Sequence, residues 1–368
     1  MAEQDPIRDI AGMVEKSMGA GGAPMTIEEQ LAVSIQDDVD ELPEGVELDT
    51  GEEEVPIVAE PYNHDANLAE VLEDGVLASI ASDLQAKVKE DLESRSDWEE
   101  AIAKGLNLLG INYEDRSDPF LGASGVTHPL LSEATTQFQS QAYKEMLPSG
   151  GPVKTQILGV ATKETEDQAQ RIKDYMNYQI TEVMEEYDQD TDQMLFYLPL
   201  TGSTFKKVYF DPTKQRAVSK FVPAEDLIVP YSASDIRTAE RVTHMVRMSY
   251  NDIRKLQVAG VYKDVELSAK NSEGDEGAIQ EATDELQGLY PNYSDDSYTL
   301  LEVHVDQGSN QVLSVVRNFR EQDPLKRKRQ YFVHFKFLPG FGFYGFGLLH
   351  TIGGLSRAAT SILRQLID

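Results

Sequence analysis

Residues 196–222, FYLPLTGSTFKKVYFDPTKQRAVSKFV, contain the change of hydrophobic period that decides the fold class. Before Pro199 the apolar side chains recur every three to four residues, which indicates helices, and after it they recur every second residue. The alternating runs 204–210 and 217–222 flank Asp211-Pro212-Thr213-Lys214, which is typical of a hairpin turn. Helices followed by strands, without βαβ alternation, predict an α+β fold and not a doubly wound sheet.

The flanking sequence extends this pattern in both directions. The apolar spacing predicts long N-terminal helices and, after the hairpin, meandering β-strands with one short helix. A last helix closes the pattern. The expected helices cover 67–92, 96–110, 129–147, 164–187, 249–259 and 348–367, and the expected later strands cover 237–248, 298–306, 311–318 and 329–338. The acidic stretch 263–296 contains Gly274 and Gly277 and is expected to be a mobile excursion or edge insertion.

Charge and cysteine content exclude several classes of protein. The chain has 368 residues, with 64 acidic and 33 basic side chains and a net charge of −31. Bulk attraction to nucleic acid or to an anionic membrane is therefore not expected. The absence of cysteine excludes a disulfide-stapled secreted fold and favours an intracellular origin. Residues 1–60 hold seventeen acidic and two basic side chains and no aromatic residue, which predicts a disordered acidic arm.

One glycine-rich turn resembles a phosphate-binding motif. Gly340 to Gly345 matches G-x-G-x-x-G between a predicted strand and a predicted helix, so one alternative is a nucleotide-binding enzyme. Bulky aromatic residues fill the variable positions, and no second parallel strand follows. We therefore expect a structural turn, in which Gly340, Gly342, Gly345 and Gly347 permit close backbone approach while the aromatic side chains pack.

The same region raises a second alternative. Residues 337–355 form a stretch without a formal charge, and this stretch is nearly as long as a membrane span must be. It would suit an acidic membrane-associated scaffold. Pro339 and six glycines make a spanning helix unfavourable, so no membrane partner is expected.

No catalytic, metal or cofactor site emerges from the motifs. The six histidines have no metal-ligand spacing and no serine or aspartate partner at motif distance. Asp188, Asp190 and Asp192 begin a calcium-loop pattern, but Gln193 and Pro199 occupy two of its required positions. We expect no enzymatic activity, no cofactor and no metal.

Two groups of basic residues are candidate contact sites. Lys326-Arg327-Lys328-Arg329 is the only concentrated basic run, and nucleic-acid contact, a solvated turn and an intersubunit contact all remain open for it. Arg357 and Arg364 lie seven residues apart on the last predicted helix, where acids of a neighbouring subunit are possible partners.

From Trp98 onward the chain resembles the portal proteins of tailed double-stranded DNA bacteriophages. The resemblance covers about 270 residues and depends on the order of several short motifs. These motifs are WEE (98–100), DPFLGAS (118–124), HPLL (128–131), GPVK (151–154), GSTFKKVY (202–209), FVPAEDL (221–227) and FLPGFGFYGFG (337–347).

The resemblance implies a structural, non-enzymatic ring at one capsid vertex, typically of twelve subunits. Such a head–tail connector forms the channel for genome packaging and ejection, through which double-stranded DNA passes without sequence specificity. The implied partners are capsid, terminase and tail adaptor proteins. The implied location is the virion, with assembly in the host cytoplasm. A high negative charge suits a channel that must not hold DNA tightly.

The same resemblance divides the chain into three parts. Residues 1–62 are the acidic arm and match no known motif, residues 63–339 are a wing-like α+β domain, and residues 340–368 are the glycine–aromatic turn and the start of a stem helix. The clip, the second stem helix and the crown have no counterpart, so we expect the N-terminal portion of a longer chain.

Overall fold

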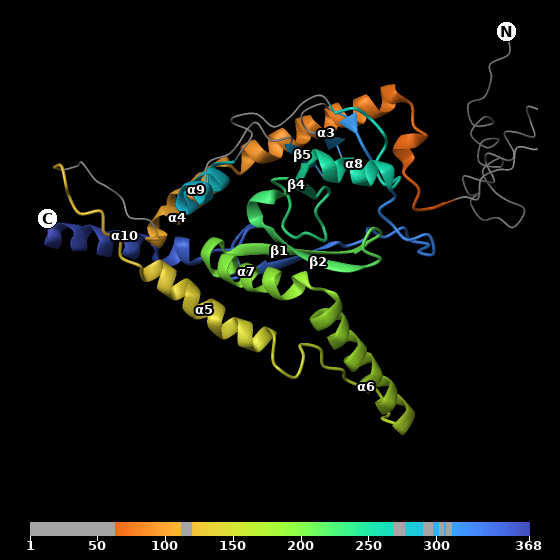
Figure 1. Ribbon diagram of the computed structural model, residues 1–368, viewed down its shortest axis with the longest axis horizontal. Coiled ribbons are helices and arrows are strands. Elements are labelled where there is room, and N and C mark those ends of the chain that lie inside the picture. The colour runs from red at the N-terminus through yellow and green to blue at the C-terminus, as the bar shows by residue number, and fades with distance from the viewer. Residues whose placement is uncertain (1–62, 112–119, 268–276, 290–296, 302–304, 307–310) are drawn as a thin grey trace, which may run out of the picture. The chain divides into compact units, whose positions relative to one another are not determined.

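The computed structural model describes residues 63–111, 120–267, 277–289, 297–301, 305–306 and 311–368, and their fold is α+β (Figure 1). The chain divides into two units, residues 1–62 and 63–368, and only the second is described here. Several sequence predictions lie outside the described residues: the acidic arm 1–62, the Asp118-Pro119 motif, the turn at 308–310 and parts of 263–296.

The first of the N-terminal helices begins later than predicted, whereas the second begins at Ser96 as predicted. A 3₁₀ turn, Leu68–Glu70, precedes α3 (Asp74–Ser94), so the expected helix over 67–92 is wrong in its first turns. The Asn67 side chain causes this break, because its Oδ1 accepts the N–H of Ala69 and that of Val315 while its Nδ2 donates to Leu313 O. Arg95 separates α3 from α4 (Ser96–Leu106), and a short 3₁₀ turn, Asn107–Leu109, leads to Gly110.

The middle helices are α5 (Leu130–Met146), α6 (Lys163–Tyr178) and α7 (Glu186–Thr201). The predicted single helix over 164–187 is wrong, because a π turn (Gln179–Val183) and the non-helical Met184 separate α6 from α7. The helix also continues past Pro199 and ends at Gly202, whose φ of +92° suits glycine.

Three antiparallel strands form the first sheet, in the order β2-β1-β8. They are β1 (Ser203–Asp211), β2 (Arg216–Pro223) and β8 (Phe332–Lys336). The predicted hairpin is confirmed, with Asp211 opposite Arg216 at the turn. Strand β8 pairs antiparallel with β1, placing Lys336 opposite Ser203.

The second sheet has the order β3-β4-β5-β6-β7. Its strands are β3 (Leu227–Ile228), β4 (Thr243–Ser249), β5 (Ser297–Leu301), β6 (Val305–Asp306) and β7 (Gln311–Val312), and a 3₁₀ turn (Ala224–Asp226) connects the two sheets. The predicted strand over 237–248 is therefore half as long as expected. Ser249 caps α8 (Tyr250–Val258) as predicted.

A helix inside the acidic stretch corrects one prediction. Residues 278–287 form α9 (Ala278–Gln287), which packs against α4. Ile279 and Ala282 are buried in one cluster with Ile102 and Leu106, so this part of 263–296 belongs to the core and is not an edge insertion.

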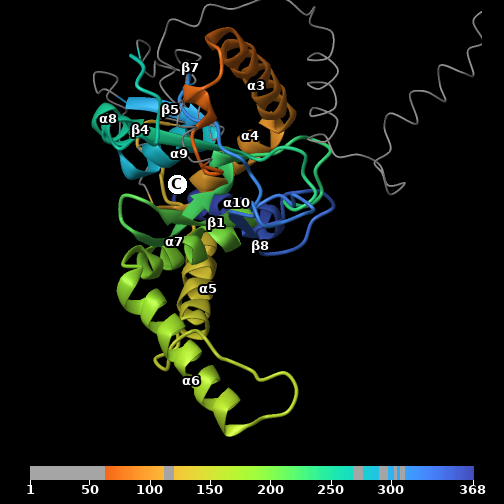
Figure 2. The ribbon, with the colours of Figure 1, turned by 90° about the vertical axis from the view of Figure 1, so that its right-hand side faces the viewer.

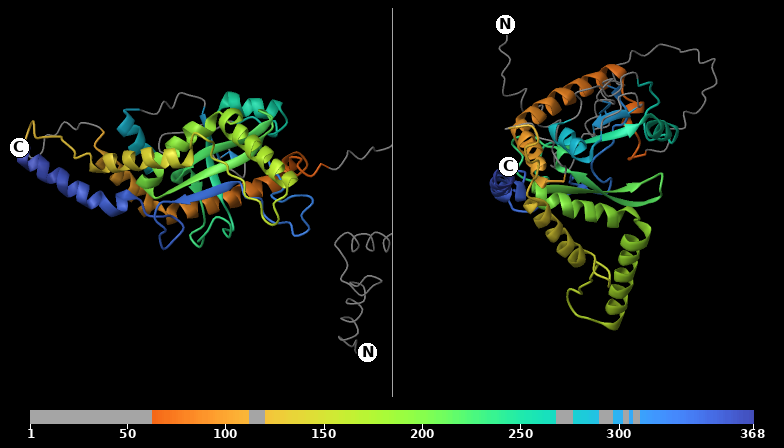
Figure 3. Two further views of the ribbon diagram at one scale, coloured as in Figure 1. Left: turned by 90° about the horizontal axis from the view of Figure 1, so that it is seen from below. Right: turned by 60° about the vertical axis from the view of Figure 1, so that its left-hand side comes forward.

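The last helix, α10 (Leu348–Ile367), matches its prediction in both bounds. It contacts α4, α5 and α7, and its C-terminal end projects away from both sheets (Figure 3).

Candidate functional site

Three distant segments meet at the glycine–aromatic turn, and we call this meeting point the junction. It comprises Arg95 and Trp98, residues 200–203, and residues 338–347. The backbone of 338–347 closes on itself, because the N–H of Phe346 donates to Leu338 O at 2.8 Å and that of Leu338 donates to Phe346 O at 3.2 Å. The N–H of Gly345 donates to Ser203 Oγ at 2.7 Å, which joins the turn to β1.

Close backbone contacts explain most of the glycines in the turn. A Cβ at Gly347 would lie 2.2 Å from Leu200 O, and one at Gly345 would lie 2.6 Å from Gly202 O. A Cβ at Gly340 would lie 2.7 Å from Tyr344 O. Gly342 differs, since no atom lies within 4 Å of its Cβ position. The prediction of close approach therefore holds at Gly340, Gly345 and Gly347 and is wrong at Gly342.

The aromatic residues of the turn have two different environments. Tyr344 stacks on Trp98 with ring centroids 4.3 Å apart, and Phe343 is buried against Phe205. Phe341 is fully exposed, contrary to the expectation that all these rings pack. The stacked rings fix the turn against the start of α4. The turn then leads directly into α10.

Arg95 holds the junction together, and the sequence analysis missed it. Its Nη1 donates to Leu227 O at 2.9 Å and to Tyr344 Oη at 3.0 Å, and its guanidinium also pairs with Glu99 at 2.7 Å. A lone arginine between two helices carries no periodic signal, so nothing in the sequence distinguishes it from a solvated side chain. Burial, with the carboxyl of Asp226 nearby, raises the pKa of the adjacent Glu225 to about 7.

A serine–histidine pair lies in the same region. His334 Nε2 is 3.2 Å from Ser203 Oγ, although no such pairing was predicted. Ser203 is completely buried and already accepts the Gly345 N–H, so no substrate can reach its hydroxyl. Burial lowers the pKa of His334 to about 4. The pair therefore fastens β8 to β1 and lacks the access that a nucleophile needs.

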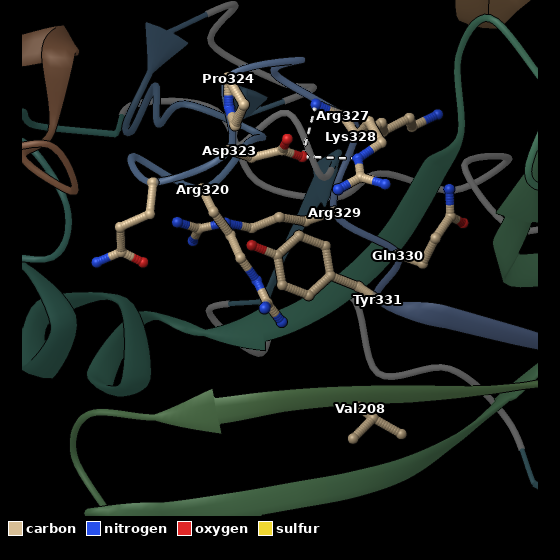
Figure 4. Close-up of a pocket in the computed structure, with 10 residues that line it drawn as sticks. Val208, Arg320, Asp323, Pro324, Arg327, Lys328, Arg329, Gln330 and Tyr331 are labelled. Carbon is tan, nitrogen blue, oxygen red and sulfur yellow. Dashed lines mark hydrogen bonds and ion pairs between the residues drawn. The ribbon is translucent and has the colours of Figure 1, made fainter.

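Three residues of the basic run, Arg327, Lys328 and Arg329, line an open hollow of about 590 Å³ (Figure 4). Arg327 Nε pairs with Asp323 Oδ2 at 2.9 Å, and Arg329 Nη2 pairs with Asp65 Oδ1 at 3.2 Å. Lys328 Nζ donates to Ala239 O at 3.2 Å, and burial lowers the pKa of this ammonium. Lys326 lies over the ring of Phe319. Each of the four cations thus has a contact within the chain, while Lys326, Arg327 and Lys328 remain exposed.

The two arginines of α10 are placed differently. Arg364 Nε donates to Val126 O at 2.8 Å and its Nη2 donates to Thr127 Oγ1 at 3.1 Å, so this side chain holds the 125–127 segment of its own chain. Arg357 is exposed and makes no ion pair within the described residues.

One face of α10 is covered and another is not. Gly353, Ser356 and Thr360 are buried, and Thr360 Oγ1 accepts the N–H of His128 at 3.0 Å. Leu355, Ile362 and Leu366 are 64%, 59% and 78% exposed and follow helical spacing, so they form an apolar ridge.

A second exposed apolar stripe lies on α6, within what we call the α6 segment, residues 148–183. No residue from 136 to 190 is buried, although Ile172, Tyr175 and Met176 lie on one helical face. Figures 1 and 2 show α6 extending away from both sheets.

The described residues contain neither a cluster that could hold a metal ion nor a helix that could cross a bilayer. No group of three or more histidine and acidic side chains among them is placed to hold a metal ion. The acidic residues of the calcium-loop pattern have separate partners. Asp188 accepts a hydrogen bond from Tyr143 Oη, and Asp190 accepts one from the N–H of Phe221. No helix in the described part of the chain is both long and apolar enough to cross a bilayer. No protein-family model matches this chain, and comparison with curated proteins gives no match.

Proposed function

We propose that this chain is a structural subunit of the portal ring of a tailed bacteriophage, which forms the channel for double-stranded DNA at the capsid vertex. The observation that carries this proposal is the junction. Trp98 stacks on Tyr344, and Gly202 lies against the backbone of residues 345–347, so three of the seven motifs on which the resemblance depends meet there. These three motifs therefore pack on one another although they lie far apart in the sequence.

The two exposed apolar surfaces support assembly with other copies. A single chain leaves the α10 ridge and the α6 stripe in water, at a cost of about 25 cal/mol per Å² of apolar surface. A ring would cover such surfaces by packing each subunit against its neighbours. We place the start of the stem at α10, because the junction fixes its first turn while its ridge faces outward.

The two alternatives find less support. A phosphate-binding turn needs free N–H groups, but those of Gly345, Phe346 and Gly347 donate to Ser203, Leu338 and His350. A membrane scaffold would need residues 337–355 to face lipid, but Phe343 is buried and Tyr344 stacks on Trp98, so only part of the stretch, including Phe341, is exposed.

The direct test is to image the purified full chain by negative-stain electron microscopy and to weigh it by mass photometry. We expect a ring with a central hole. A homogeneous monomer at micromolar concentration would contradict the proposal.

The α10 ridge offers a sharper form of this test. The double variant Leu355→Glu/Leu366→Glu should abolish rings and leave the melting temperature of the single chain nearly unchanged, because both side chains are exposed. A matched control is Val258→Glu on α8, which is also an exposed apolar position. Rings that persist in the ridge variant would show that α10 is not an assembly surface.

A further inference from the structure

The basic hollow is unusual on so acidic a chain. Residues 317–331 contain six basic and two acidic side chains, whereas the whole chain has a net charge of −31. We propose that this hollow binds the phosphate backbone of nucleic acid, an inference that rests on the proposed function only in taking double-stranded DNA as its natural ligand. The residues that would make the contact are Arg320, Arg327 and Arg329.

Arg320, Arg327 and Arg329 line the same hollow as Tyr331 (Figure 4). The guanidinium of Arg320 has no hydrogen-bond or ion-pair partner among the described residues. Arg327 uses only Nε for Asp323, so both of its terminal nitrogens stay available. Since a guanidinium has five N–H donors, these arginines can still bind phosphate oxygens in pairs.

The loop that carries the arginines is ordered by its own hydrogen bonds. The N–H of Asp323 donates to Arg320 O at 3.1 Å, and the N–H of Arg329 donates to Asn318 O at 2.9 Å. Asp323 accepts the N–H groups of Leu325 and Arg327 through its two carboxylate oxygens. A site ordered in this way loses little conformational entropy when it binds a ligand.

Charge density favours a nucleic acid over an acidic protein segment. Duplex DNA carries about one charge per 1.7 Å of its axis, whereas an extended peptide carries at most one per residue, or about one per 3.3 Å. The duplex therefore brings about twice as much negative charge to a hollow of this size. Because the rest of the chain repels DNA, we expect a weak, salt-dependent contact that lets the duplex move.

The test measures the binding of a fluorescein-labelled 30-base-pair duplex to the full chain by fluorescence anisotropy between 50 and 200 mM NaCl. The variant Arg320→Gln/Arg327→Gln should weaken binding about tenfold at the lowest salt. It should also reduce the slope of log K against log salt by about 2, since each phosphate contact contributes about 0.9. Arg329 is left unchanged, because its pairing with Asp65 supports the fold.

Three controls keep this result interpretable. The variant Arg320→Lys/Arg327→Lys keeps the charge and should keep the salt slope, but it should bind more weakly than the wild type because an ammonium cannot make the paired hydrogen bonds. The variant Arg171→Gln/Lys173→Gln removes two positive charges from α6 and should bind like the wild type. Circular dichroism melting establishes that each variant is folded.

Other outcomes would overturn the inference. These are an equal loss in the α6 control, no binding by the wild type at 50 mM NaCl, or displacement of the duplex by polyglutamate at a lower charge concentration, which would indicate an acidic protein partner. Mass photometry of the same samples separates the two proposals. Rings without DNA binding count against the hollow alone, whereas DNA binding without rings counts against the portal proposal.

Discussion

The junction and the α6 segment represent two opposite ways of using apolar and polar side chains. In the junction, backbone contacts are so close that three glycines leave no room for a Cβ, and a buried arginine bonds to carbonyl, phenol and carboxylate groups. In the α6 segment no side chain is buried, and its apolar stripe faces water. The junction is formed entirely by residues of one chain, whereas the α6 segment has an apolar surface that no other described residue covers.

The strongest test of this difference is a substitution in the turn. Gly347→Val should cost more than about 4 kcal/mol and prevent folding, because its Cβ would overlap Leu200 O. Denaturant unfolding can follow this directly, since Trp98 is the only tryptophan and lies in the junction. The control is Gly342→Val, at a position with open space, which should change the free energy of unfolding by less than about 1 kcal/mol. A folded Gly347→Val protein would mean that the turn is not closely packed.

Arg95 provides the next test. Arg95→Met should cost about 3–5 kcal/mol, because it leaves Glu99 and the buried carbonyls without their partner. Lys104→Met is the matched control, since its pair with Glu100 is exposed and worth less than about 1 kcal/mol. Equal unfolding midpoints for the two variants would show that Arg95 is dispensable.

The pKa of His334 predicts a dependence of stability on pH. Its pKa is about 4 in the folded chain and about 6.5 when unfolded, so the unfolded state binds more protons between these values. Stability should therefore fall as the pH drops from about 6.5 to 4, by at most about 1.4 kcal/mol per pH unit.

Glu225 acts in the opposite direction, so the measurement must compare two proteins. With its pKa raised to about 7, Glu225 lowers stability as the pH rises from about 4.5 to 7. The difference between wild-type and His334→Gln unfolding free energies, measured from pH 4 to 7, removes this contribution. A difference that does not change with pH would show that His334 is already exposed to solvent.

The smallest effect is expected in the α6 segment. Ile172→Ser/Met176→Ser should change the unfolding free energy of the single chain by about 0.5 kcal/mol or less, since both side chains are exposed. If another copy covers this stripe, the same variant should shift the concentration at which rings form. A large loss of monomer stability would show that α6 packs within its own chain.

The sequence predicted the elements whose signals are local. The β1–β2 hairpin, the Ser249 cap and both ends of α10 follow from turn residues and apolar periodicity within a few positions. Close backbone approach was also expected from the glycines of the turn, and the structure has it at Gly340, Gly345 and Gly347.

Features that depend on distant partners were not predictable in the same way. Arg95 gains its role from carbonyls about 130 residues away. Gly342 has the same local context as Gly345, but only Gly345 faces the corner at Gly202. Helix α9 lies in an acidic stretch, and its burial becomes evident only when α4 is placed beside it.

The turn between α6 and α7 has a consequence for how the chain can change over evolution. Residues 179–183 form one π turn, in which the N–H of Met184 donates to Gln179 O at 2.9 Å, and neither proline nor glycine is present there. Because a π turn contains more residues than an α turn, gain or loss of one residue can interconvert them. A single codon insertion or deletion would then rotate α6 relative to α7, which gives natural variants a simple way to reach differently shaped neighbours.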